Sequence, residues 1–153
     1  MKDIYLYNYN SPEGELVRLL IQSKDNNAVL KKDLPTNSVL TKAPIIQDRD
    51  ILITGLYPII EYLEERYPEP RLFPLATPED RARMRMLLDE LLTNLFTNPE
   101  NTPEIDWVQL MPAHGEFLLG TKRSILDLVI AATSPDDIEE FNAHRRQVLV
   151  SIH

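Results

Sequence analysis

The sequence contains no cysteine, which excludes disulfide bonds, thiolate chemistry and zinc sites built on cysteine. Its four glycines do not form a phosphate-binding loop, and its three histidines show no metal-ligand spacing, so we expect no metal. No apolar run approaches the roughly 20 residues that a membrane helix needs. The first ten residues also lack the apolar block of a signal peptide. We therefore expect a cytoplasmic protein that does not enter a membrane.

Basic residues are also in short supply. The sequence has 16 lysines and arginines against 24 aspartates and glutamates, for a formal net charge of −8. A nucleic-acid-binding protein normally presents a basic stripe that neutralises phosphates. The densest basic cluster, "EDRARMR" at residues 79–85, is interrupted by acidic and apolar residues. The composition therefore argues against direct binding to nucleic acid and favours a basic protein surface as the partner.

The first 67 residues alternate between strand and helix signals. "IYLYNY" at residues 4–9 is typical of a strand, and "SPEGELVRLLIQSK" has leucines at helical spacing behind Ser11, a good cap, and Pro12. We predict a second strand within "NNAVLKKDL", a hairpin made of "PIIQ" and "DILI", and a helix over residues 55–67. That helix must begin near Gly55 or Leu56, because Pro58 is tolerated only in the first turn. The helix between the first two strands makes them parallel.

The second half of the chain predicts helices only. Thr77 and Pro78 form a helix start, and the apolar positions that follow at helical spacing are Met84, Leu87, Leu88, Leu91, Leu92 and Leu95. Ser124 and Asp127 predict another helix start, where both side chains accept backbone N–H groups, and a last helix is expected near Ser134. The proline-rich "YPEPRLFPLATP" separates the halves. We predict a domain over residues 1–67, a connector over 68–77 and a helical domain over 78–153.

The order strand, helix, strand, hairpin, helix is thioredoxin-like, and with helices behind it the chain resembles the glutathione transferase superfamily. "SPEGELVRLL" resembles the first helix of that family, and "KAPII" resembles its strand with a cis-proline, here Pro44. "DILITGLYPIIEYLEERYP" resembles its strand-to-helix segment, and "FLLGTKRSILDLVIAA" the folding signature of its helical domain. The resemblance implies an α/β thioredoxin-like N-terminal domain plus an all-α C-terminal domain, here shortened. It also implies a homodimer.

Within the superfamily, the connector resembles the bacterial stringent starvation protein A branch, in which a Pro-x-Pro segment forms a surface pocket that contacts RNA polymerase. The matching positions here are Tyr67, Pro68, Glu69, Pro70, Arg71, Leu72 and Pro74. Glu69 stands where the branch usually has His, and Arg71 replaces the second proline of a pair. The resemblance implies RNA polymerase or a sigma factor as the partner. Alternatively, the segment is a rigid strap whose Leu72 and Phe73 fill the space between the domains.

The same resemblance implies a glutathione site, and the residues there are poorly suited to it. Ser11 stands where the family activates the thiol, and Tyr7 is a second candidate, although we favour a helix cap for Ser11 and strand packing for Tyr7. Thr54 and Gly55 replace the family's Glu-Ser pair; Thr54 lacks a carboxylate and Gly55 offers only its backbone N–H. Losing one charge-assisted contact costs about 1.5–3 kcal/mol. Pro44 can still present the backbone that pairs with a peptide, or can only shape the loop. We interpret this as a degraded glutathione site.

Two functions from different classes follow. We favour a non-catalytic, transcription-associated regulator of the stringent starvation protein A type, which needs no cofactor. The alternative is a glutathione-dependent transferase or peroxidase that uses Ser11 or Tyr7. A third possibility is a truncated relative that serves only in dimerisation. Fold resemblance alone does not decide among them.

Overall fold

The computed structural model describes residues 2–7, 9–33, 43–73, 77–93 and 123–133, together with 143, 146, 147 and 150–152. The chain divides into two compact units, Met1–Pro70 and Arg71–His153. Several predicted features lie outside the described residues: Pro74, Leu95, the "FLLG" segment and the helix expected near Ser134.

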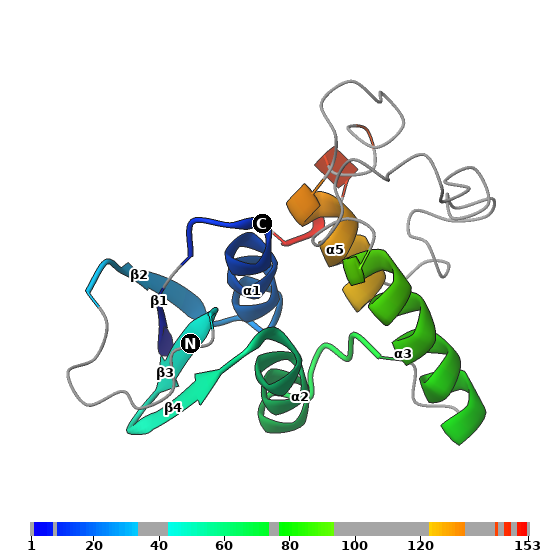
Figure 1. The fold of residues 1–153 in the computed structure, drawn as a ribbon, viewed down its shortest axis with the longest axis horizontal. Coiled ribbons are helices and arrows are strands. Elements are labelled where there is room, and N and C mark those ends of the chain that lie inside the picture. Colours follow the sequence, from blue (N-terminus) through cyan, green and yellow to red (C-terminus); the bar gives the residue numbers. More distant parts are fainter. Residues whose placement is uncertain are drawn as a thin grey trace. The chain divides into compact units, whose positions relative to one another are not determined.

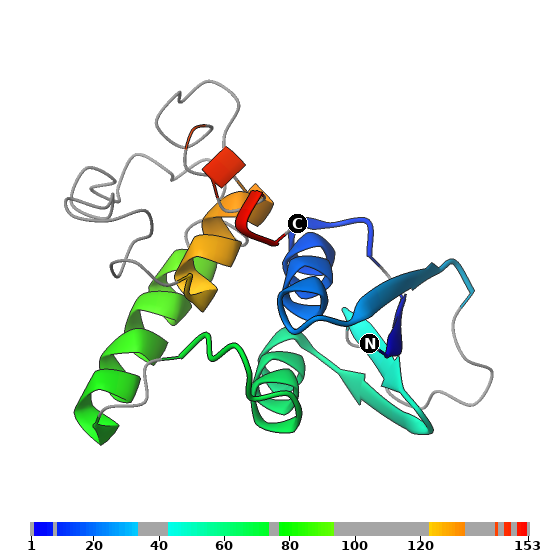
Figure 2. The same ribbon diagram turned by 180° about the vertical axis from the view of Figure 1, so that it is seen from behind.

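The first unit is a mixed four-stranded sheet with two helices (Figure 1). Its elements are β1 (Asp3–Tyr7), α1 (Pro12–Ser23), β2 (Asn27–Lys31), β3 (Ile45–Asp48), β4 (Ile51–Thr54) and α2 (Leu56–Arg66). The strand order is β2-β1-β3-β4. β1 is parallel to β2 and antiparallel to β3, which forms a hairpin with β4. Both helices lie on the same side of the sheet in both views (Figure 1 and Figure 2). The predicted thioredoxin-like arrangement is confirmed.

Local signals explain where the helices of this unit begin. Ser11 is the N-cap of α1, and Pro12 takes the first turn, where its missing N–H is not needed. α2 begins at Leu56, so Pro58 lies in its first turn, as the sequence predicts. Gly55, the residue that precedes α2, has a φ of 91°, a backbone region that favours glycine.

The core of the first unit is built from apolar residues of the inner strands β1 and β3 and of the two helices. Its largest fully buried side chains are Ile4, Leu6, Leu16, Leu19, Leu20, Ile21, Ile45, Ile46, Ile59, Ile60 and Leu63. Leu6 of β1 pairs in register with Ile46 of β3, so two inward-facing side chains stand next to each other across the ladder.

The second unit contains α3 (Pro78–Leu92) and α5 (Ile125–Thr133), which contact each other. Thr77 caps α3 by accepting the Asp80 N–H at 3.1 Å, as predicted. Most of the predicted apolar stripe is buried: Met84, Leu88, Leu91 and Leu92. Leu87, which follows the same helical spacing, is 36% exposed. The reason is that Leu87 lies at the edge of the arc that the other four residues define around the helix.

The start of α5 differs in detail from the expectation. Asp127 Oδ2 accepts the Ser124 backbone N–H at 2.8 Å, as predicted. The Ser124 hydroxyl, however, donates to the same oxygen at 3.0 Å instead of accepting from the backbone. A buried carboxylate is a stronger acceptor than a hydroxyl, so it takes both donors. Within the described part of the chain, no helix is both long and apolar enough to cross a membrane.

Candidate functional site

Ser11 lies between β1 and α1, where the resemblance expects the thiol-activating group. Its Oγ accepts the Gly14 N–H at 3.0 Å, which is the bond of a helix cap. The preceding loop folds tightly against the helix, and a Cβ on Gly14 would lie 2.3 Å from the Tyr9 carbonyl oxygen. Glycine is therefore required at position 14. The hydroxyl hydrogen of Ser11 is not used by the cap bond, so this half-buried side chain still has one donor.

Tyr7 is engaged inside the sheet. Its side chain is 7% exposed, and its hydroxyl donates to Gln47 Oε1 on β3 at 3.0 Å. A phenol that is buried and already donating its hydrogen does not present that hydrogen to a thiolate. The geometry favours the packing interpretation of Tyr7 over the catalytic one.

The structure brings Pro44, Thr54 and Gly55 together at the open ends of β3 and β4. The Ala43–Pro44 peptide bond is cis, as predicted. The Pro44 carbonyl accepts the Gly55 N–H at 2.9 Å, so the one group that Gly55 was expected to offer is already used. A serine in place of Gly55 would be strained by its positive φ. Thr54, half-buried at the end of β4, supplies a hydroxyl but no carboxylate.

A hollow of about 380 Å³ lies near Ser11, at the ends of β1 and β2. It is lined by Tyr9, Asn10, Lys31 and Lys32. The Lys31 ammonium lies 5.1 Å from the centre of the Tyr5 ring, a distance at which a cation and an aromatic ring attract each other. Sequence reasoning missed this pair of lysines, for which "KKD" was the available signal.

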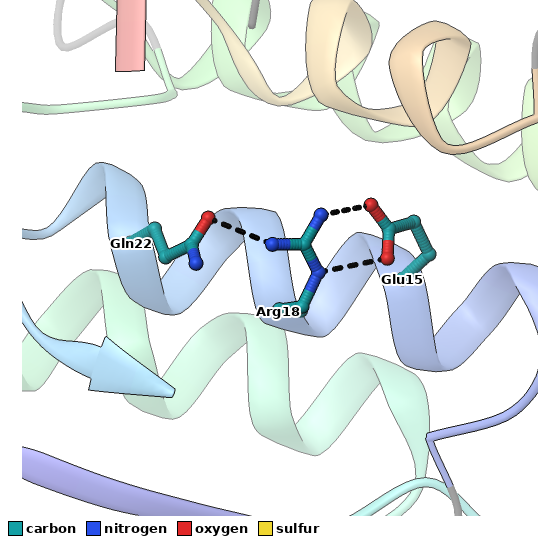
Figure 3. Close-up of polar contacts among 3 residues, drawn as sticks. All are labelled: Glu15, Arg18 and Gln22. Atoms are coloured by element: carbon teal, nitrogen blue, oxygen red, sulfur yellow. Dashed lines mark hydrogen bonds and ion pairs between the residues drawn. The ribbon is translucent and has the colours of Figure 1, made fainter. Parts of the chain in front are cut away.

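A polar cluster on α1 satisfies itself (Figure 3). The Arg18 guanidinium donates to both carboxylate oxygens of Glu15: Nε donates to Oε2 at 2.8 Å, and Nη2 donates to Oε1. Its third nitrogen, Nη1, donates to Gln22 Oε1 at 3.2 Å. The hydrogen bond from Arg18 to Glu15 raises the pKa of the guanidinium above its usual value, against the opposing effect of burial. Because all three residues belong to one helix, this cluster stabilises α1.

At the end of β3 away from Pro44, two tyrosines converge on one buried carboxylate. The hydroxyls of Tyr62 and Tyr67 donate to Asp48 Oδ2 at 2.6 and 2.7 Å. Asp48 ends β3 and is 1% exposed. Burial first, and the hydrogen bond to Asp48 second, raise the pKa of each tyrosine to about 12. The carboxylate thus ties the C-terminal half of α2 and its C-cap to the β3–β4 hairpin.

The buried side chain of Lys24 holds the segment that follows α2. The Lys24 side chain is 0% exposed, and its Nζ donates to Glu64 Oε2 at 2.7 Å and to the Pro70 carbonyl at 2.6 Å. The Arg66 guanidinium lies 5.2 Å from the centre of the Tyr67 ring. Sequence reasoning missed both Lys24 and Asp48, because nothing in a single sequence distinguishes a buried charge from a solvated one.

The connector residues that the resemblance singled out have different surroundings. Pro68, Glu69, Pro70 and Arg71 are exposed. Leu72 is 2% exposed, and its carbonyl accepts the Ile125 N–H at 3.1 Å. Leu72 is therefore a packing residue of the second unit and is removed from the candidate surface. We define the connector surface as residues 68–71.

Comparison of the sequence with known proteins finds one kind of relative. No family model matches the chain. A stringent starvation protein A homolog from Coxiella burnetii is 29% identical over an aligned length of 104, which covers 58% of this chain and 49% of that protein. The match thus spans about half the length of that curated relative.

Solved structures of glutathione transferases are similar in three dimensions. A glutathione transferase homolog from Burkholderia, with bound glutathione, has a TM-score of 0.69 and 19% identity, covering 95% of this chain and 90% of that one. A glutathione S-transferase from Rhodospirillum rubrum has a TM-score of 0.67 and 21% identity, covering 97% and 87%. The chain therefore has the glutathione transferase fold, and its sequence is similar to that of a stringent starvation protein A homolog.

Proposed function

We propose that this chain is a non-catalytic, transcription-associated regulator of the stringent starvation protein A type, which acts in the cytoplasm. It binds RNA polymerase or a sigma factor through the connector surface, residues 68–71. The observation that carries the proposal is that these four residues are exposed while polar contacts hold the chain at the Tyr67 hydroxyl and at the Pro70 carbonyl.

A surface of this kind suits recognition. Pro68 and Pro70 fix two backbone φ angles, and the Tyr67 hydroxyl and the Pro70 carbonyl are both bonded to the first unit. A segment that is already ordered loses little conformational entropy when it meets a partner. Glu69 and Arg71 supply charged groups of both signs, which give specificity and orientation more than raw affinity.

The state of the glutathione site supports a role without catalysis. Two of its candidate donors are used within the protein: the Tyr7 hydroxyl by Gln47 and the Gly55 N–H by Pro44. Thr54 provides no negative charge for an ammonium group. A tripeptide binding here would lack a charge-assisted contact, which contributes both affinity and orientation.

A glutathione-dependent transferase or peroxidase is the second candidate. Two observations favour it: the Ser11 hydroxyl retains a donor, and one of the similar structures holds glutathione. Ser11 would then donate its hydrogen to the thiolate while accepting the Gly14 N–H. Saturable binding of glutathione with a micromolar dissociation constant would support this candidate over the regulator.

The test of the regulator is capture of RNA polymerase from the native cell extract by the tagged chain. The double change Glu69→Ala with Arg71→Ala should weaken capture and change the free energy of unfolding by less than about 0.5 kcal/mol, as at ordinary surface sites. Glu79→Ala with Arg81→Ala is the matched control, because it removes the same two residue types at the same spacing from exposed positions of α3. If the unmutated chain captures no polymerase, or the Glu69/Arg71 variant captures it equally well, the connector surface is only a strap.

A further inference from the structure

Lys24 is an unusual residue in the first unit because its charged side chain is 0% exposed. Burying an ammonium group is costly unless the group is paired and hydrogen-bonded. Lys24 has both kinds of partner, a carboxylate at 2.7 Å and a backbone carbonyl at 2.6 Å. These partners, Glu64 and Pro70, lie 40 and 46 residues further along the chain. A buried charge that reaches two such distant segments fixes their relative position.

The carbonyl partner belongs to the connector surface itself. Pro70 is exposed as a residue, so water could satisfy its carbonyl oxygen, yet the Lys24 ammonium takes it instead. Three residues earlier, the Tyr67 hydroxyl donates to Asp48. Pro68 and Glu69 therefore lie between two points at which the backbone is tied to the first unit.

We infer that Lys24 is a positioning residue for partner binding. Through the Pro70 carbonyl it holds Pro68 and Glu69 in the arrangement that the partner recognises. This inference rests on the proposed function of the connector surface. The competing explanation is that the Lys24–Glu64 pair only stabilises the fold.

Two variants separate positioning from stability. Glu64→Gln weakens the ion pair but leaves the bond from Lys24 to the Pro70 carbonyl, so it should lower thermal stability and leave connector order unchanged. Lys24→Met with Glu64→Met replaces the pair by apolar side chains of similar volume, a change that commonly preserves stability. It also removes the ammonium that donates to the Pro70 carbonyl, so the connector should loosen. If this variant does not fold, Lys24→Leu with Glu64→Leu replaces it, since leucine also has no donor for the Pro70 carbonyl.

Connector order can be measured without any partner. Because the chain has no cysteine, Glu69→Cys creates a single site for a nitroxide spin label. Glu65→Cys, at an exposed position of α2, is the matched control site. We expect the methionine pair to increase label mobility at position 69 and not at position 65, and Glu64→Gln to change neither. Unchanged mobility at position 69 overturns the inference.

Capture of RNA polymerase by the unlabelled variants completes the test. The methionine pair should bind about tenfold more weakly, as expected when a few extra side chains must be ordered on binding. The Glu64→Gln variant should bind as the unmutated chain does. Loosening with undiminished capture would overturn the role of Lys24 in binding. If even the unmutated chain captures no polymerase, the proposed function fails, and label mobility alone decides whether Lys24 orders the connector.

Discussion

Asp48 accepts hydrogen bonds from two tyrosine hydroxyls through one carboxylate oxygen. This contact gives a structural role to Tyr62 and Tyr67, two residues of the strand-to-helix motif. Tyr62 and Tyr67 lie on the last turns of α2 and at its C-cap, and both reach the carboxylate at the end of β3. Its other oxygen, Oδ1, is buried with no hydrogen-bond partner among the described residues. A carboxylate in these surroundings depends on the two phenols for most of its compensation.

The pH dependence of stability should report this cluster. Both tyrosines have a pKa near 12 in the folded protein, above the ordinary value of 10.0, so the folded state holds these protons more tightly than the unfolded state. The stabilisation is complete below pH 10 and is lost as the pH rises toward 12, because there only the unfolded chain releases the protons. Urea unfolding at a series of alkaline pH values measures the effect.

The variant Tyr62→Phe with Tyr67→Phe isolates the contribution of the two phenols. It should be less stable than the unmutated chain at pH 8, since Asp48 loses two hydrogen bonds. Its stability should also fall less between pH 10 and 12. Equal alkaline slopes for both proteins would assign the dependence to other groups.

At the scale of a helix, Ser11 is explained by capping. Ser11→Ala should lower the free energy of unfolding by about 0.5–2 kcal/mol, the usual effect of losing an N-cap side chain. Ser11→Asp should restore it, because aspartate caps as well as serine does. Thr77→Ala, which removes the cap of α3, is the matched control for the size of the loss. Failure of Ser11→Asp to rescue stability would mean that the hydroxyl has a role beyond the Gly14 bond.

At the scale of the whole molecule, we predict that the protein does not bind glutathione usefully. Thr54 lacks the carboxylate, and the Gly55 N–H is bonded to the Pro44 carbonyl. Calorimetry at millimolar glutathione should therefore give no saturable heat, whereas a glutathione transferase with its Glu-Ser pair intact should give a clear isotherm. A micromolar dissociation constant for this chain would contradict the prediction.

A homodimer is the second prediction at this scale. α3 exposes Met86 at 70% and Leu87 at 36%, adjacent apolar residues that a second copy could cover. Sedimentation equilibrium at micromolar concentration should give about twice the chain mass of 17.7 kDa, as expected for a two-fold dimer. Leu87→Asp should shift the equilibrium toward monomer, whereas Ala82→Asp at another exposed position of α3 should not. A monomer at that concentration would count against the prediction.

The sequence by itself determined the order of the elements, the parallel pairing of β1 with β2, the Ser11 and Thr77 caps and the start of α2. The caps and the helix start depend on residues within a few positions of one another, which proline, helical spacing and capping side chains report directly. The parallel pairing follows from the helix that connects the two strands. The exposed Leu87 marks the limit of this reasoning. Helical spacing shows which face of α3 is apolar but not how many of the residues on that face become buried.

Only the tertiary structure decided which polar groups are available. Tyr7 and Gln47 lie 40 residues apart in the chain, as do Lys24 and Glu64, and Lys24 and Pro70 lie 46 apart. Such pairs form when the sheet and helices pack, so no local pattern announces them. Burial then makes each bond consequential, because a buried donor or acceptor without a partner is costly. The same packing that uses the Tyr7 hydroxyl and the Gly55 N–H also ties Pro70 to Lys24.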